Sequence, residues 1–150
     1  EINRKRKKDN RYREFRGKSH IDSELKNDTG LELGFIIAPP RMAFYIDYSK
    51  KIYEVYLKYT SAEDIHVYSI DEVFIDAMSY LKTVNTSPRE FAKMIIQDIY
   101  KTTGITATTG IGTNLYLAKV AMDIVAKHVK ADEDGVRIAC LDEMRYRNKM

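Results

Sequence analysis

The sequence predicts an α+β fold in which helices pack on one face of a mixed β-sheet. Apolar residues recur at three- and four-residue spacing in residues 41–59, 88–103 and 114–128, which predicts three amphipathic helices. Residues 65–77 are rich in β-branched and aromatic residues without a helical period, which predicts two short strands. Because strands and helices do not alternate strictly, a mixed sheet is favoured over a parallel one.

The first forty residues predict less regular structure than the rest. Residues 1–8 are polar and favour a helix, whereas residues 11–34 have weak periodicity and predict an irregular segment. The Ala-Pro-Pro run at residues 38–40 is a strong break in the backbone pattern. We therefore place a boundary between a segment of residues 1–38 and a domain of residues 39–150.

The first two helices of the domain have distinct signals. The second has Ser87 as its N-cap, Pro88 in its first turn, Glu90 completing a capping box, and Gly104 at its end. Its apolar face consists of Phe91, Met94, Ile95, Ile99 and Thr102. The first helix has a stripe rich in tyrosine that we expect to face the core, namely Met42, Tyr45, Ser49, Ile52, Tyr56 and Tyr59.

The C-terminal third predicts strand, helix and strand. Residues 105–111 form a strand candidate, and a turn at residues 134–135 precedes a last short strand at residues 136–139. The helix between them, residues 114–128, has a regular apolar stripe of Leu117, Val120, Ala121, Ile124 and Val125.

The composition is that of an ordinary globular protein, with 44% hydrophobic and 31% charged residues. No apolar run reaches the roughly 18 residues of a membrane span, so no membrane partner is expected. The single cysteine, Cys140, excludes an internal disulfide and fits a cytoplasmic protein. One cysteine and three scattered histidines also disfavour a zinc site.

The net charge of +3 hides an asymmetry along the chain. Residues 1–18 hold nine Lys and Arg against three Asp and Glu, a net +6, so the remaining residues carry a net −3. A basic arm on a mildly acidic body is one pattern of nucleic-acid-binding proteins. A solvated helix end or a localisation segment has the same composition, and the pattern alone does not separate them.

Three carboxylates, Asp71, Glu72 and Asp76, interrupt the apolar strand pair. A carboxylate in apolar surroundings is costly unless it is paired, hydrogen-bonded or bound to a metal, and Mg²⁺ takes one or two carboxylates together with waters and substrate phosphates. Neighbouring strand residues point to opposite faces. Asp71 and Glu72 can therefore share a metal only at the turn near residues 69–71 or at a bulge. The alternative is an exposed turn with two solvated acids, and Asp76 is expected to be a structural or solvent-facing acid and not a ligand.

Residues 109–114 (TGIGTN) join a strand to a helix, and their two glycines allow a tight turn or the close approach of another chain. The third glycine of a dinucleotide fingerprint and the Gly-Lys-Ser/Thr of a P-loop are both missing. On the helix, Lys119, Asp123 and Lys127 form a polar stripe. This stripe is either a solvated face with ion pairs or a means for a lysine to reach a triphosphate.

Two motifs together resemble the Y-family DNA polymerases of the UmuC and DinB type. Residues 69–76 (SIDEVFID) are similar to that family's Ser-Ile-Asp-Glu-Ala-Tyr/Phe-Leu-Asp motif. Residues 109–123 (TGIGTNLYLAKVAMD) resemble its second palm motif, Val-Gly-Ile-x-x-Asn-Lys-x-Leu-Ala-Lys-x-Ala-Ser-Asp. The resemblance covers roughly residues 39–140, whereas residues 11–37 match the family's fingers only by position.

The resemblance implies a polymerase palm-like mixed sheet with a partial fingers segment. It further implies a lesion-bypass DNA polymerase that extends a primer 3′ end by two-metal nucleotidyl transfer. Asp71 and Glu72 would be the catalytic metal ligands, for two Mg²⁺ ions with Mn²⁺ as an alternative. Lys127 would bind the nucleotide triphosphate, although the family spacing is Asp-x-x-Lys and this chain has one more residue after Asp123. Lys119 and Asn114 would contact DNA.

The sequence also departs from the family. The first metal motif, Phe-x-Asp-x-Asp/Asn-x-Phe-Phe-Ala, is not found, and Asp47 in residues 45–48 (YIDY) resembles it only superficially because it lies on a helical pattern. No thumb or little finger is recognised, so we expect a fragment with an incomplete palm that is inactive alone. The implied partners are primer–template DNA, deoxynucleoside triphosphates and, through other regions, a sliding clamp. The implied location is the bacterial cytoplasm at the nucleoid, in the SOS response to DNA damage.

Two other interpretations compete with this one. Diguanylate-cyclase type domains also carry an acidic hairpin, Gly-Gly-Asp/Glu-Glu-Phe, but no glycine pair precedes Asp71. The main alternative is a non-catalytic scaffold or nucleic-acid-binding module driven by the basic arm. DNA affinity that depends on salt but not on Mg²⁺ would favour this alternative.

Overall fold

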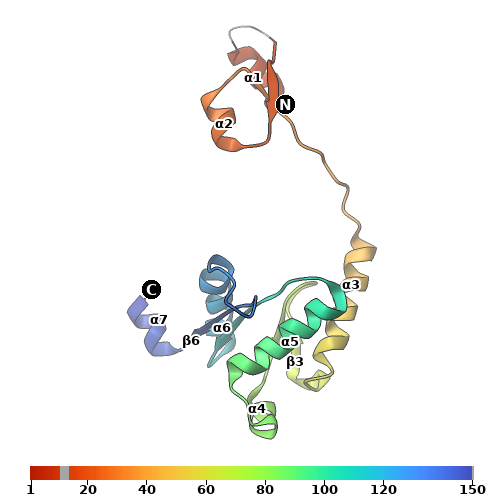
Figure 1. Cartoon of the computed structure of the whole chain (residues 1–150), viewed down its shortest axis with the longest axis vertical. Helices are drawn as coiled ribbons and strands as arrows, with labels where there is room; N and C mark the ends of the chain where they lie inside the picture. The colour runs from red at the N-terminus through yellow and green to blue at the C-terminus, as the bar shows by residue number, and fades with distance from the viewer. Residues whose placement is uncertain (11–13, 150) are drawn as a thin grey trace. The chain divides into compact units, whose positions relative to one another are not determined.

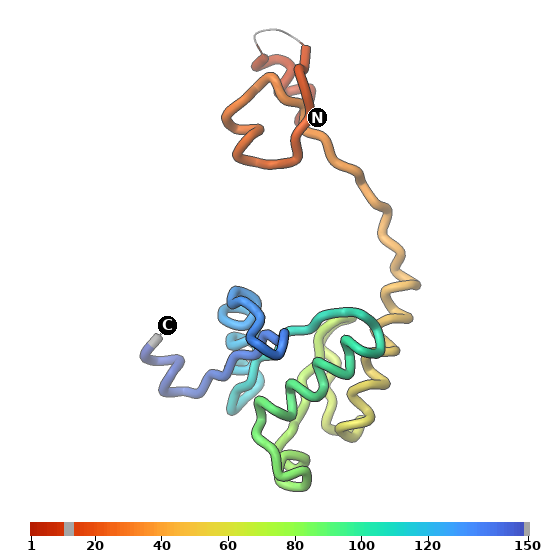
Figure 2. Tube along the Cα trace, in the orientation of Figure 1, coloured from red at the N-terminus to blue at the C-terminus, as the bar shows by residue number. Residues whose placement is uncertain are grey.

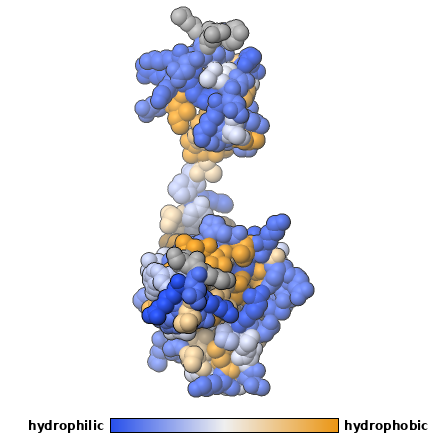
Figure 3. Space-filling view, turned by 90° about the vertical axis from the view of Figure 1, so that its left-hand side faces the viewer, coloured by the Kyte–Doolittle hydropathy of each residue, from blue (hydrophilic) through white to orange (hydrophobic). Residues whose placement is uncertain are grey.

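The computed structural model describes residues 1–10 and 14–149, and it divides into two compact units (Figure 1). Unit 1 is Glu1–Pro40 and unit 2 is Arg41–Met150. None of the helices formed by the described residues is both long and apolar enough to cross a bilayer. On the face shown in Figure 3, both units are mostly hydrophilic, with smaller hydrophobic patches.

Unit 1 contains two helices and one pair of strands. The strands β1 (Gly17–Ser19) and β2 (Leu31–Leu33) are parallel, with α1 (Ile2–Asp9) before them and α2 (Asp22–Asn27) between them. The expectation of irregular structure is therefore wrong for residues 14–34, while residues 11–13 lie outside the described part of the chain.

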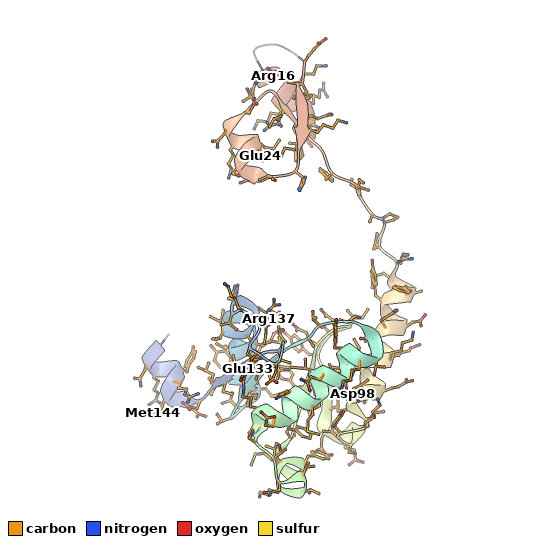
Figure 4. The ribbon with its side chains drawn as sticks, in the orientation of Figure 1. Arg16, Glu24, Asp98, Glu133, Arg137 and Met144 are labelled. Carbon is orange, nitrogen blue, oxygen red and sulfur yellow. The ribbon has the colours of Figure 1, made fainter. Side chains whose placement is uncertain are left out.

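Side chains from α1 organise unit 1. The Arg6 guanidinium donates hydrogen bonds to the carbonyl oxygens of Leu31 (3.0 Å), Leu25 (2.9 Å) and Asp28 (2.9 Å). Nearby, the Asp28 carboxylate accepts a hydrogen bond from Arg16 at 3.0 Å. Arg16 is labelled in Figure 4. Regularity here comes from these tertiary hydrogen bonds, which satisfy backbone groups, and so it leaves no periodic pattern in the sequence.

Unit 2 confirms the predicted α+β class. The strands β3 (Ile65–Val67) and β4 (Val73–Ile75) form the expected antiparallel hairpin, whereas β5 (Thr108–Gly112) and β6 (Arg137–Leu141) pair in parallel. The described strands thus form separate two-stranded sheets instead of one continuous sheet. Around them lie α3 (Met42–Tyr56), η1 (Ala62–Asp64), α4 (Met78–Val84), α5 (Pro88–Thr103), α6 (Leu115–Val120), η2 (Ala121–Val125), η3 (Ala126–His128) and α7 (Glu143–Lys149).

The core of unit 2 has two sides. On one side, Val55 of α3 packs against the face of α5 formed by Phe91, Ile95 and Ile99, and Ile75 of β4 packs against this cluster. On the other side, α6 and η2 bury Leu117, Ala121 and Ala126 against Ala139 and Leu141 of β6. In the chain trace of Figure 2, α5 leads directly into the β5–α6 segment, so α5 connects the two sides.

The helix α5 has the predicted ends. The Ser87 hydroxyl accepts a hydrogen bond from the Glu90 backbone N–H (3.2 Å), and Gly104 adopts a left-handed conformation (φ 72°) at the C-cap. The short helices α4 and α7 were not predicted, because each is only seven residues long and has no buried residue described.

The tyrosine stripe of α3 differs from its prediction. Tyr45 remains 44% exposed, and the buried residue of the helix is Val55. Tyr56 and Tyr59 do pack against the core cluster. The stripe is therefore core-facing only in its second half, because the first half borders an open cleft.

The predicted helix of residues 114–128 is present but not regular. It begins as the α-helix α6, continues as the π-helical turn η2, and ends as the 3₁₀ turn η3. Ile124, an apolar residue of the expected stripe, does not face the core, since its side chain is 56% exposed. The wider π-helical turn carries Ile124 out of the apolar stripe.

Candidate active site

One cleft in unit 2 contains every site residue that the sequence predicts. It has a volume of about 1360 Å³ and is bordered by α3, the β3–β4 hairpin, β5 and the helical segment that follows β5. Its lining includes Asp71, Glu72, Asn114, Lys119 and Lys127. The hairpin acids and the helix lysines therefore face the same space, although they belong to two separate motifs.

The hairpin turn gives the two neighbouring acids different surroundings. The backbone N–H groups of Tyr68 and Ser69 both donate to the Glu72 carbonyl oxygen, at 3.0 and 3.1 Å. The Asp71 carboxylate is exposed and accepts from the Ser69 hydroxyl at 2.8 Å, whereas the Glu72 side chain is only 21% exposed. The expected cost of a carboxylate in apolar surroundings therefore applies to Glu72 and not to Asp71.

Glu72 is compensated by two lysines from the helical segment. The Lys119 ammonium lies 2.6 Å from its Oε2 atom, and the Lys127 ammonium lies 3.5 Å from its Oε1 atom. Asp123 contacts both lysines, at 3.2 Å from Lys119 and 2.7 Å from Lys127. The predicted polar stripe is thus an ion-pair network that includes an acid 47 residues away from Lys119.

The network keeps both lysines charged. The hydrogen bond from Lys119 to Glu72 raises the pKa of the ammonium despite partial desolvation. The hydrogen bond from Lys127 to Asp123 raises the pKa of Lys127 and lowers the pKa of the Asp123 carboxyl. The site therefore brings two ammonium groups against the carboxyl groups of Glu72 and Asp123, and the Asp71 carboxyl group lines the same cleft.

Close packing of β5 against the helix brings these groups together. A Cβ atom at Gly110 would lie 2.0 Å from the Ala118 carbonyl oxygen, and one at Gly112 would lie 2.3 Å from the Ala118 nitrogen. Only glycine permits this backbone-to-backbone contact. At the helix start, the Asn114 side chain accepts from the Leu117 N–H (2.9 Å), so Asn114 is an N-cap.

The donor set fits a hard divalent cation only in part. Asp71 and Glu72 supply carboxylates on the same cleft, which suits Mg²⁺ when waters and phosphates complete its shell. Across residues 1–10 and 14–149, no group of three His, Cys, Asp or Glu side chains could hold a metal. Asp76 accepts from the Met78 N–H (3.1 Å) at the start of α4, and Asp47 is exposed on α3.

Sequence patterns missed two contributors to the site. Asp123 was recognised as part of a polar stripe, but not as the residue that bridges both lysines. The Tyr68 ring, whose centroid lies 5.2 Å from the Lys119 Nζ atom, was not singled out. Tyr68 directly precedes the residue 69–76 motif. That position does not predict the contact with Lys119, because cation–π contacts have no sequence pattern.

The chain is similar in fold to solved Y-family polymerase structures, which confirms the predicted resemblance. DinB from Sulfolobus solfataricus has a TM-score of 0.55 and 26% identity over 75% of this chain and 30% of its own. An insertion ternary complex of Dbh DNA polymerase has a TM-score of 0.56 and 27% identity over the same shares, 75% and 30%.

The chain belongs to the impB/mucB/samB family, whose sequence profile matches residues 24–123. Among curated relatives, DNA polymerase IV 2 of Bacillus subtilis (strain 168) is 41% identical over 95 residues, which is 63% of this chain and 22% of that protein. The chain therefore spans less than a third of the length of each of these relatives.

Proposed function

We propose that this chain forms the palm, with part of the fingers, of a lesion-bypass DNA polymerase that adds deoxynucleotides to a primer 3′ end. The observation that carries the proposal is the 2.6 Å contact between Lys119 and Glu72. This contact joins the two motifs that resemble the family's palm motifs within one cleft. The polymerase names of the relatives support the same activity.

Asp71 and Glu72 would hold the metal ions in this proposal. Two bound Mg²⁺ ions, or Mn²⁺, would stabilise the attacking and leaving oxygens of the displacement. Asp71 is exposed at the tip of the turn and free to bind a cation, while Lys119 orients Glu72. Binding of a metal at Glu72 requires its two lysines to turn to other anions.

The basic groups would then bind phosphate. Lys127 is the candidate for the nucleotide triphosphate, because its ammonium stays charged and lines the cleft. Lys119 and the Asn114 side-chain amide nitrogen would donate to DNA phosphates. We assign primer–template DNA, deoxynucleoside triphosphates and a sliding clamp as partners of the whole protein. The bacterial nucleoid, in the cytoplasm, is the location that these partners imply.

The test uses the complete protein that contains this sequence. Asp71→Ala should reduce primer extension in Mg²⁺ by more than about a hundredfold, since a lost metal ligand removes several kcal/mol of transition-state stabilisation. Asp47→Ala is the matched control, because Asp47 is an exposed acid of unit 2 outside the cleft lining. Equal primer extension by the wild type and Asp71→Ala would refute the assignment.

A second candidate, non-catalytic DNA binding by this chain alone, is favoured by helix α1. Asn3 and Arg6 bind β2 and the end of α2, so they hold α1 in place. Arg4, Lys5 and Lys8 are exposed, and none of them forms an ion pair within the described residues. These three cations form a face suited to phosphates.

This second candidate predicts a salt dependence that does not need Mg²⁺. Neutralising about three phosphates gives a slope of log affinity against log salt of roughly −2 to −3. Changing Arg4, Lys5 and Lys8 to Ala should remove that slope, whereas the same charge change at the exposed Lys82, Lys101 and Lys130, which lie outside the cleft lining, should not. DNA binding that requires Mg²⁺ would exclude this candidate.

A further inference from the structure

The helical segment of residues 115–128 contains one π-helical turn, η2. The Ala126 N–H donates to the Ala121 carbonyl oxygen five residues back, as well as to that of Met122. An i to i−5 hydrogen bond means that one residue more than in an α-helix occupies this turn. The turn lies within the ion-pair network, between Lys119 and Lys127.

The extra residue matters because of the angle between the two lysines. Eight residues of a regular α-helix would rotate Lys127 by about 80° from Lys119, at about 100° per residue. If one residue is absorbed by the π turn, the rotation equals that of seven residues, about 20° short of two full turns. The two ammonium groups can then meet the same carboxylate, and both contact Glu72.

The apolar face of the segment provides an independent observation. Ala121 and Ala126 are both fully buried in one core cluster, although they are five residues apart. In a regular helix that spacing would put them about 140° apart, on different faces. Ile124, which a regular helix would bury, is exposed. On the charged face and on the apolar face alike, residues that share a contact are therefore one position further apart than a regular α-helix allows.

We propose that the π turn is a positioning device: it absorbs one inserted residue, so that Lys127 stays aligned with Lys119 on Glu72 while Ala126 stays in the core. The link from this alignment to nucleotide binding rests on the proposed function. The alignment itself does not, because it concerns contacts within this chain. Ile124 lies in the π turn and is exposed, so it is the residue that can be removed without loss of a core or cleft contact.

The test removes the extra residue. Deletion of Ile124 reduces the spacing from Lys119 to Lys127 from eight positions to seven, so Lys127 should keep its contact with Glu72. The contact is measured by NMR cross-peaks between the two side chains. Deletion of Val125 gives the same spacing and is the second variant. The matched control inserts one Ala after Ile124, which should rotate Lys127 away and abolish the cross-peaks. Loss of the contact in the deletions, its survival in the insertion, or failure of both deletions to fold would overturn the proposal.

Kinetics of the complete protein provide a second readout. The Ile124 deletion should leave KM for deoxynucleotides within about threefold of wild type, while the Ala insertion should raise KM at least about tenfold with a smaller change in kcat. A purely structural role of the turn would not separate KM from kcat in this way. Absence of polymerase activity in the wild-type protein would refute the proposed function, but the NMR result would still decide the alignment.

Discussion

Two helical regions of unit 2 follow different rules. Helix α5 has a side-chain N-cap at Ser87, a glycine C-cap at Gly104 and four buried apolar residues, so its local signals predict its ends and most of its burial. Of the predicted apolar face, Phe91, Ile95 and Ile99 are buried in one cluster, whereas Met94 and Thr102 are exposed. The segment of residues 115–128 also has a side-chain N-cap, Asn114, but its geometry changes from α to π to 3₁₀ along its length. The irregular region is the one that carries the charged groups of the cleft.

The comparison shows that α5 mainly packs the core, whereas the segment of residues 115–128 packs the core and also places charged side chains in the cleft. In α5 the buried face decides the register, and its charged residues form ion pairs at the edge: Asp98 (Figure 4) with Lys58, Arg89 with Asp132, and Lys93 with Asp134. In the second region the register must satisfy a core face and a charged face at the same time. Departures from local rules are expected at such sites.

The largest difference between the two regions should appear in the free energy of unfolding. Ile99→Ala in α5 should lower the free energy of unfolding by about 2–5 kcal/mol, because Ile99 is 1% exposed and the core cannot fully close the cavity. Lys127→Ala should change unfolding little while weakening nucleotide binding by the complete protein. Urea titration of this chain measures the first effect. If Ile99→Ala unfolded at the wild-type urea concentration, the two regions would not differ in the way described.

The two N-caps give a matched pair with a smaller effect. Ser87→Ala and Asn114→Ala should each cost about 1 kcal/mol of unfolding free energy, because each removes one side-chain cap. Only Asn114→Ala should also lower DNA affinity in the complete protein, since Asn114 lines the cleft. Similar DNA affinities in both variants would show that Asn114 is a cap alone.

Lowering the pH should have the smallest effect on the free energy of unfolding, and the effect should arise in both regions. Contacts with Lys58 lower the pKa of Asp98, and contacts with Lys127 lower the pKa of Asp123, below their usual value of 3.8. A lowered folded-state pKa means that the stabilisation is present above about pH 4 and is lost as the pH falls through the lower value. Asp98→Asn should therefore reduce the acid sensitivity of unfolding by less than about 1 kcal/mol. An acid profile identical to wild type would mean that the Lys58 pair contributes nothing.

High salt offers a control for the acid experiment. Exposed ion pairs are screened at high ionic strength, so the difference between wild type and Asp98→Asn should shrink there. The pair of Glu72 with Lys119, whose lysine is 26% exposed, should be less sensitive to salt than the pair of Asp98 with Lys58, whose lysine is 54% exposed.

The sequence alone determined the features that depend on local chemistry. Cap residues, Gly104 and apolar periodicity defined α5, and β-branched residues defined the hairpin of β3 and β4, because these signals act between residues close together in the chain. The same holds for the family: two short motifs carried the resemblance, and the five candidate site residues all line one cleft.

Only the tertiary structure decided how distant segments meet. The regular structure of residues 14–34 depends on hydrogen bonds from Arg6, which no pattern in those residues encodes. Likewise, Glu72 is half-buried while its neighbour Asp71 is exposed, and the π turn keeps two lysines on Glu72. Each of these features depends on contacts between residues that are far apart in the chain. Spacing along the sequence therefore cannot predict them, because packing and charge act together only in the folded structure.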